Sequence, residues 1–267
     1  MKKTLNLVKI GGNIIDDETK LNQFLEDFAQ IPGLKILVHG GGKTATEMSS
    51  NLGLETTMVN GLRITDAETL RVVTMVYGGL INKTIVAKLQ AQECNAIGFT
   101  GADANLIPAS KRAAGKYDFG YAGDIIPGVI RGEKIAFFLD NGLVPVFAPL
   151  THDKAGSLLN TNADTIASAL AIALSEQYET RLYYCFEKNG VLSDMKDEDS
   201  VMEELTLEKY RAIKHEGLIS KGMLPKLDNA FKALLAGVSS VVICHAEEIG
   251  NVLVHHKKTG TELKNNS

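Results

Sequence analysis

The chain has 267 residues, of which 45% are hydrophobic and 22% charged, and its formal net charge at pH 7 is −4. This composition is ordinary for a folded globular protein and allows a large buried core. The negative charge gives no electrostatic reason to expect nucleic acid or an anionic membrane as a partner. We expect a cytoplasmic protein, because the apolar run behind the basic start 1–3 is too short for a signal peptide and no stretch approaches the roughly 20 apolar residues of a membrane span.

Three cysteines, Cys94, Cys185 and Cys244, each lie in or beside an apolar segment. They form no Cys-x-x-Cys pair and no Cys/His cluster with the spacing of metal ligands. We therefore predict free, buried thiols in a reducing compartment and no metal site built from protein side chains.

The first two predicted strands both end in glycines. The apolar run 5–10 stops at Gly11-Gly12, and the run 36–39 stops at Gly40-Gly41-Gly42 in front of a helix-compatible stretch. Glycine lets backbone N–H groups approach an oxyanion closely, and a helix N-terminus adds partial positive charge. We favour two anion cradles, which would hold two anionic groups near each other, over ordinary turn glycines.

The glycine motifs exclude two common nucleotide-binding patterns. They match neither GxxxxGK[ST] nor GxGxxG, which argues against a P-loop and against a dinucleotide-binding fold. Lys9 lies inside the first apolar run and would be expelled from a core unless an anion required it, although a lysine that snorkels from the strand end is the alternative. His39 is interpreted as a core histidine satisfied by the backbone rather than as a general base.

The chain alternates predicted strands and helices, which favours a parallel sheet covered by helices on both faces. The two halves of the chain should share one continuous sheet. In the first half, the sequence predicts a helix over 16–28, a strand over 35–38, a helix from a Thr65/Glu68 capping box towards Tyr77, a separate helix over 80–90, a strand over 96–101 and hairpins within 110–134. A strand over 143–150 follows, and its prolines argue against a central position in the sheet. The rest of the chain predicts a helix over 160–174, a strand over 181–186, helices over 205–215 and 226–236, a strand over 239–244 and a final edge strand.

Further polar residues stand at helix starts. Arg63 precedes one of them, and its guanidinium suits a carboxylate, although a surface salt bridge is the alternative. Asn160, Asn162 and Asp164 gather at another helix start, where an N-cap accounts for only one of the three. Lys226 begins a late helix and, taken alone, indicates a solvated lysine.

Five motifs together resemble those of the acetylglutamate kinase branch of the amino acid kinase family. The resemblance covers essentially the whole chain. It implies one domain, 1–267, with a three-layer αβα sandwich and a mainly parallel central sheet. It also implies that residues 1–175 bind an acylated glutamate, that 176–267 bind ATP, and that the γ-phosphoryl group moves to the side-chain carboxylate in arginine biosynthesis. The motifs are Val8-Lys9-Ile10-Gly11-Gly12, Val38-His39-Gly40-Gly41-Gly42, Asn60-Gly61-Leu62-Arg63-Ile64-Thr65, Asn160-Thr161-Asn162-Ala163-Asp164 and Gly222-Met223-Leu224-Pro225-Lys226.

The same resemblance implies roles for individual residues. Lys9 and Lys226 would flank the transferring phosphoryl group as charge stabilisers, and Asp164 would hold both lysines in position. Magnesium would be carried by the phosphates of ATP and by water. The remaining implied contacts are backbone bonds from Gly11, Gly12, Gly41 and Gly42 to phosphoryl and carboxylate oxygens, acceptor contacts from Arg63 and Asn160, and nucleotide contacts from Glu187, Gly190, Leu218, Ile219 and Ser220.

Departures from the family pattern leave the acceptor open. The run 186–190 replaces a Thr/Ser-Asp-Val-Pro-Gly-like segment on the nucleotide side and leaves the adenine and ribose contacts open. On the acceptor side, the run 43–46 replaces a Pro-rich one, and residues 110–125 are unusual around the substrate hairpin. The acceptor is therefore N-acetyl-L-glutamate or a larger N-acylglutamate such as N-succinyl-L-glutamate. A kinase for glutamate or carbamate is disfavoured by Arg63 in its motif.

A second alternative is a non-catalytic nucleotide or metabolite sensor. Such a sensor would be expected to lose Lys9, Lys226 or Asp164, and all three are present. The chain begins directly with the first strand, without the extra N-terminal helix that links dimers into hexamers in arginine-inhibited relatives. The resemblance therefore implies an arginine-insensitive homodimer.

Overall fold

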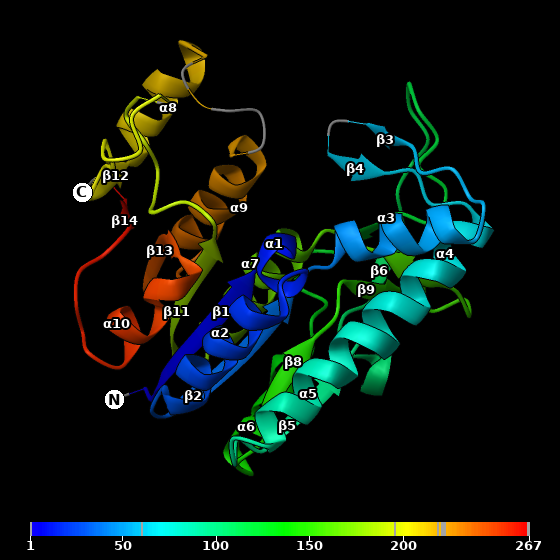
Figure 1. Cartoon of the computed structure of the whole chain (residues 1–267), viewed down its shortest axis with the longest axis horizontal. Coiled ribbons are helices and arrows are strands. Elements are labelled where there is room, and N and C mark those ends of the chain that lie inside the picture. Colours follow the sequence, from blue (N-terminus) through cyan, green and yellow to red (C-terminus); the bar gives the residue numbers. More distant parts are fainter. Residues whose placement is uncertain (1, 60, 195, 218, 220–222, 266–267) are drawn as a thin grey trace.

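A computed structural model describes residues 2–59, 61–194, 196–217, 219 and 223–265. One eight-stranded sheet runs through it in the order β12-β14-β13-β11-β1-β2-β8-β5 (Figure 1). Its neighbouring strands are parallel, except for the antiparallel pair β13–β14. The strands of this sheet are β1 (Thr4–Ile10), β2 (Leu34–His39), β5 (Ala96–Phe99), β8 (Val144–Phe147), β11 (Glu179–Phe186), β12 (Glu204–Thr206), β13 (Ser240–His245) and β14 (Thr261–Lys264).

Three two-stranded ribbons and a set of helices complete the described part of the chain. The ribbons pair β3 (Met58–Val59) with β4 (Leu62–Arg63), β6 (Ala109–Lys111) with β7 (Gly123–Ile125), and β9 (Leu150–His152) with β10 (Leu158–Asn160). The helices are α1 (Gly12–Ile15), α2 (Glu18–Gln30), α3 (Gly42–Asn51), α4 (Ala67–Val73), the π-helix η1 (Thr74–Ile81), α5 (Asn82–Gln90), the 3-10 turn η2 (Asp103–Asn105), α6 (Gly132–Asp140), α7 (Ala163–Leu174), α8 (Leu207–His215), α9 (Leu224–Leu235), the 3-10 turn η3 (Ala246–Glu248) and α10 (Ile249–Leu253).

Helices cover both faces of the sheet, so the predicted three-layer αβα sandwich with a mainly parallel sheet is confirmed. On one face, α2 packs against α5 and α10. On the other face, α7 packs against β1 and β11 and contacts α6 and α9. Strand β11 follows residue 175 in the chain and pairs with β1, so a single sheet joins the two halves of the sequence, as predicted.

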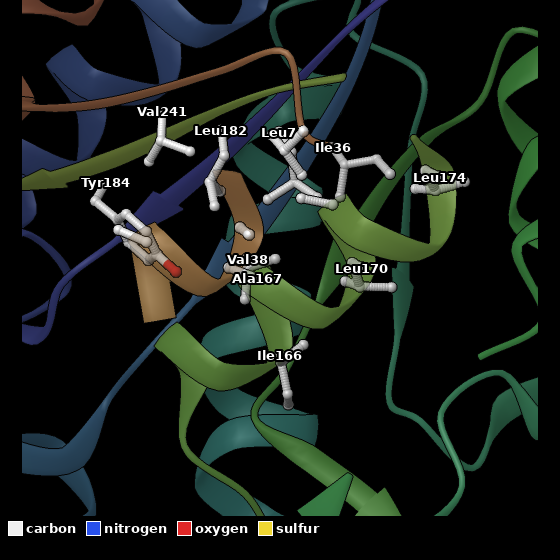
Figure 2. Packing of buried hydrophobic residues seen from close by; sticks show 14 of the residues in the cluster. Leu7, Ile36, Val38, Ile166, Ala167, Leu170, Leu174, Leu182, Tyr184 and Val241 are labelled. Carbon is white, nitrogen blue, oxygen red and sulfur yellow. The ribbon is translucent and has the colours of Figure 1, made fainter. Parts of the chain in front are cut away.

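Strand β1 shows why the strands read as almost continuous apolar runs. Leu5 and Leu7 belong to the core under α7, whereas Val8 and Ile10 belong to the core under α2. Both faces are buried, so alternate side chains must both be apolar. Figure 2 shows the α7 side of this packing, where sheet residues meet the helix. Lys9 shares the face of Leu5 and Leu7, and the alternation therefore aims it at α7.

The strand with two nearby prolines lies one place from the edge of the sheet, so it avoids the centre, as its prolines indicated, but it is still an inner strand. Strand β8 lies between β2 and β5. Pro145 pairs with Ile97 of β5, but pairing with β2 begins only at Val146. The missing N–H of Pro145 therefore costs no bond on the β2 side.

The two helices predicted over 65–90 are one continuous helical run. The π-helix η1 contains Gly78 and Gly79 and connects α4 to α5 without a break. The predicted Thr65 cap is also wrong, because Asp66 is the N-cap and its side chain accepts from the N–H of Thr69 at 2.8 Å. The hydroxyl of Thr65 instead donates to the carbonyl of Arg63.

This run, Ala67–Gln90, has the length and mean hydropathy of a membrane-crossing helix, which the sequence reading did not expect. Length and composition alone are weak evidence, since core helices meet the same criteria. In the most apolar 18-residue stretch of this run, 44% is buried inside the protein, and α5 packs on α2, β5 and β8. We assign it as a helix that covers the sheet.

Two other expectations fail at the ends of predicted segments. The hairpin region ends with β7, and α6 begins at Gly132, a helix that was not predicted. The last strand, β14, is not an edge strand, because β12 pairs with its outer side. The three-residue strand β12 is too short to be recognised from sequence periodicity.

Replacement of Leu170 by alanine should lower the free energy of unfolding by about 2–5 kcal/mol, because the side chain is fully buried between α7 and the sheet (Figure 2). Urea unfolding followed by circular dichroism measures this loss. The matched control is Leu235→Ala on α9, where the side chain is 53% exposed and the expected change is within about 0.5 kcal/mol. Equal losses in the two variants would contradict the assigned core.

Candidate functional site

A cavity opens where β1 and β2 end, which is the edge at which parallel α/β sheets bind ligands. It brings together seven of the residues selected from the sequence. Lys226 does not line the cavity itself, but its side chain forms an ion pair with Asp164, which does. The seven are Lys9, Gly12, Gly41, Gly42, Arg63, Asn160 and Asp164.

Two lysines share one buried carboxylate at this cavity. The Nζ of Lys9, on β1, lies 2.6 Å from one oxygen of Asp164, and the Nζ of Lys226, on α9, lies 2.8 Å from the other. The side chains of Lys9 and Asp164 are 7% and 9% exposed, whereas that of Lys226 is 22% exposed. Three elements distant in sequence therefore converge on one ion cluster, which we call the lysine–aspartate triad.

Charge pairing determines the ionisation of this triad. Burial alone would raise the pKa of Asp164, but the charges of Lys9 and Lys226 outweigh burial and lower the pKa to about 2. Burial lowers the pKa of Lys9, and the attraction of Asp164 opposes that effect. Asp164 is thus a fixed anion at neutral pH, which holds two ammonium groups at one place.

The start of α7 fixes the backbone of Asp164. The side chain of Asn162 is the N-cap and accepts from the N–H of Thr165 at 3.0 Å. The buried hydroxyl of Tyr184, on β11, donates to the carbonyl of Asp164 at 3.0 Å. Asn162 is therefore the capping residue among the three polar residues at this helix start. The side chains of Asp164 and Asn160 are not needed as helix caps and line the cavity.

The second glycine cradle accepts no side chain at its centre. Gly41 has φ +138°, and a Cβ there would lie 2.2 Å from Cδ1 of Ile81 on the π-helix. Tyr77, also on η1, lies 3.3 Å from the same position. Helix α3 starts at Gly42, so the first N–H groups of a ten-residue helix are directed at the cavity.

The first cradle differs from the second. The N–H of Gly11 donates to the carbonyl of Cys185 at 3.2 Å, so this donor is already used by the sheet. Gly12 lines the cavity and begins the four-residue helix α1. A backbone bond from this cradle to an anion is therefore better placed at Gly12 than at Gly11.

His39 is a core histidine, which agrees with the sequence interpretation. It is fully buried, and its Nδ1 lies 2.8 Å from the carbonyl of Gly40. Because a carbonyl only accepts, Nδ1 carries the hydrogen, and Nε2 accepts from the side-chain amide of Asn82 at 3.2 Å. Burial lowers the pKa of His39 to about 4, so the ring is neutral at pH 7.

Arg63 and Asn160 stand on two different walls of the cavity. The guanidinium of Arg63 donates to the carbonyl of Gly42 and the hydroxyl of Thr46, both at 2.8 Å, and is only 7% exposed. The amide of Asn160 donates to the hydroxyl of Thr65 at 3.0 Å. Arg63 is thus held against the second cradle and is not a surface salt bridge.

Comparison with known proteins identifies the family of this site. The model of the amino acid kinase family matches residues 4–245. The chain belongs to the amino acid kinase family. It is 55% identical to acetylglutamate kinase of Cytophaga hutchinsonii, over 97% of this chain and 98% of that one. It is 53% identical to acetylglutamate kinase of Phocaeicola vulgatus, over 99% and 100% of the two chains. These identities place it in the acetylglutamate kinase branch of the family.

Solved structures share the fold of this amino acid kinase at low sequence identity. An N-acetylglutamate synthase from Neisseria gonorrhoeae has a TM-score of 0.84 at 21% identity and covers 100% of this chain and 61% of its own. A carbamate kinase from Giardia lamblia has a TM-score of 0.70 at 14% identity and covers 99% of both chains. At these identities the likeness concerns the fold alone.

Three described residues expected to contact nucleotide, Glu187, Gly190 and Ile219, do not line the cavity of this amino acid kinase. Glu187 is exposed at the end of β11. Gly190 is buried, and a Cβ there would lie 2.6 Å from Oγ1 of Thr261, so close packing alone requires glycine. Ile219 packs partly buried against the core under α7. Leu218 and Ser220 lie outside the described residues, and the nucleotide contacts of all five stay predictions.

Sequence reasoning missed three residues at the site. Tyr77 and Arg112 line the cavity, and Tyr184 anchors Asp164. The unusual composition of residues 110–125 was the available signal for Arg112. Tyr77 and Tyr184 gave no signal, because an aromatic residue in an apolar helix or strand indicates core packing.

Stability should fall between pH 6.5 and pH 4 because of His39. The pKa of His39 is about 4 in the folded chain, whereas an ordinary histidine has a pKa of 6.5, so the unfolded state takes up a proton first as the pH falls. The full loss is about 3 kcal/mol. Urea unfolding at pH 7, 5.5 and 4.5 should show a smaller loss for His39→Gln than for the wild type. The exposed His256 provides the control variant, His256→Gln, and a wild-type slope retained in His39→Gln would refute the assignment.

Proposed function

We propose that this chain is an ATP-dependent kinase that phosphorylates the side-chain carboxylate of N-acetyl-L-glutamate, as a step of arginine biosynthesis. Membership of the acetylglutamate kinase branch supports the reaction. The observation that carries the proposal is the lysine–aspartate triad beside two glycine cradles, because it concentrates positive charge where a phosphoryl group would cross.

The reaction requires alignment and charge more than proton transfer. An oxygen of the acceptor carboxylate attacks the γ-phosphorus of ATP, and the bond from that phosphorus to the β–γ bridging oxygen breaks. The products are an acyl phosphate and ADP. The acceptor carboxylate is already ionised at pH 7, so no general base is needed. This agrees with a cavity that offers lysines and backbone N–H groups and with a neutral His39 that points to the backbone.

Each part of the cavity has a role in this proposal. Lys9 and Lys226 stabilise the charge on the transferring group, and Asp164 holds the two ammonium groups in position. N–H groups of the two cradles bind phosphoryl and carboxylate oxygens. Arg63 binds the α-carboxylate of the acceptor, and Asn160 binds its amide region.

Nucleotide and acceptor occupy different halves of the chain in this proposal. Residues 1–175 bind the acylglutamate, and residues 176–267 bind ATP, whose terminal phosphates reach Gly12. Mg²⁺ bound to the phosphates would neutralise charge on ATP. Both oxygens of Asp164 are bound by lysines, so the metal would be held by phosphates and water.

Replacement of Lys9 by methionine should lower kcat roughly 100- to 1,000-fold, because the variant loses a buried charge that stabilises the transferring group. A coupled assay of ADP release with N-acetyl-L-glutamate measures the effect, and circular dichroism checks the fold. Lys20→Met, at an exposed position on α2, should leave kcat unchanged. A Lys9→Met enzyme that turns over normally would show that the phosphoryl site lies elsewhere.

We also propose that the enzyme is a homodimer that uses the exposed side of the helical run Ala67–Gln90. Met75 and Leu80 on η1 are 56% and 52% exposed, which is unusual for large apolar side chains so close together. Light scattering should give twice the chain mass of 28.8 kDa, and Leu80→Asp should give the single mass. A wild-type monomer would refute the dimer.

A cytoplasmic location is part of the same proposal. Cys94, Cys185 and Cys244 are free and buried, which suits a reducing compartment. Fractionation of cells that express the chain should recover it with cytoplasmic enzymes, and recovery with the membranes would contradict the proposal.

A further inference from the structure

The cavity contains a further cation, Arg112, that the proposed reaction does not use. Arg112 lines it together with Lys9 and Arg63. An N-acetylglutamate has two carboxylates: one accepts the phosphoryl group beside Lys9, and the other pairs with Arg63. Arg112 is then left without a partner on the substrate.

The backbone places Arg112 on the wall that would face the acyl group. Arg112 follows β6, and its N–H donates to the carbonyl of Ala122 at 2.8 Å. Ala122 forms a parallel bridge with Asn160, whose N–H donates to Tyr121 at 2.9 Å. Arg112 and Asn160 therefore flank the same chain segment, about 10 Å apart at two strand spacings. Asn160 binds the amide region in the proposed function, and the acyl chain extends from that amide.

The guanidinium of Arg112 has a second edge available for a ligand. Its Nε and Nη2 donate to the carboxylate of Asp124 at 3.1 and 2.5 Å, which occupies the side edge of the group. The end edge, formed by Nη1 and the second hydrogen of Nη2, can bind another carboxylate in the same forked geometry. Asp124 is 49% exposed and Arg112 25%, so solvent screens their ion pair and leaves the arginine charge effective towards the cavity.

We propose that Arg112 forms a subsite for a carboxylate at the far end of the acyl group, so that the enzyme also phosphorylates dicarboxylic N-acylglutamates such as N-succinyl-L-glutamate. This inference rests on the proposed function. The chemical step is the same: the side-chain carboxylate attacks the γ-phosphorus, the bond to the β–γ bridging oxygen breaks, and ADP leaves. The distal carboxylate takes no part in the transfer. It binds the guanidinium of Arg112 and fixes the position of the acyl chain.

The test compares kcat and KM for N-succinyl-L-glutamate and N-acetyl-L-glutamate in the wild type and in three variants. The wild type should turn over N-succinyl-L-glutamate. Arg112→Met should lower the succinyl-to-acetyl ratio of kcat/KM roughly ten- to a hundredfold, chiefly through KM for the succinyl acceptor, because one charged hydrogen-bonded pair is lost. Asp124→Asn keeps the guanidinium and should keep the ratio. Lys116→Met removes an exposed charge from the same hairpin and should also keep it.

Distinct results would overturn the inference. Turnover of N-acetyl-L-glutamate without turnover of N-succinyl-L-glutamate would refute the subsite and leave the proposed function intact. Equal losses on both acceptors in Arg112→Met and Asp124→Asn would show that the ion pair only fastens the hairpin. Lack of turnover with both acceptors in the wild type would refute the proposed function and this inference with it.

Discussion

The rest of the site depends on one interaction, in which two lysines pair with the same buried carboxylate. Asp164 forms an ion pair with Lys9 of the central strand at 2.6 Å and accepts a hydrogen bond from Lys226, at the start of α9, at 2.8 Å. Without Asp164, two ammonium groups this close would repel each other and Lys9 would be buried without a counter-ion. With it, positive charge is held in place at the cavity, and in the proposed function a transferring phosphoryl group uses that charge without rearrangement of the lysines.

The fold supports this arrangement through its layers. Alternation along β1 aims Lys9 at α7, and Tyr184 on the neighbouring strand β11 fixes the backbone of Asp164. On the other side of the cavity, the π-helix presses Ile81 and Tyr77 against Gly41, which excludes a side chain there. π-helical segments often accompany functional sites, and here the segment closes the wall of the second cradle. The cavity therefore lies between a charged wall and a backbone wall.

Much of this could be read from the sequence because the signals are local. Apolar runs that end in glycines mark parallel strands with their loops at one edge, and Lys9 within such a run already favoured an anionic partner over a lysine that snorkels to solvent. The N-cap at Asn162 left Asp164 free for another role. Other features depend on tertiary contacts: Pro145 is tolerated in an inner strand only because the β2 ladder begins one residue later, and Arg112 reaches the cavity only because its hairpin pairs beside Asn160. No periodicity in one sequence reports such contacts.

The central claim is that Lys9 and Lys226 both bind the phosphoryl group as it crosses. A crystal structure with ADP, Mg²⁺, aluminium fluoride and N-acetyl-L-glutamate tests it directly, because the planar fluoride occupies the position of the transferring group. The account predicts the Nζ atoms of both lysines within hydrogen-bond distance of fluoride atoms, with Asp164 still bound to both. A fluoride bound away from these lysines, or a Lys226 turned out of the cavity, would contradict it.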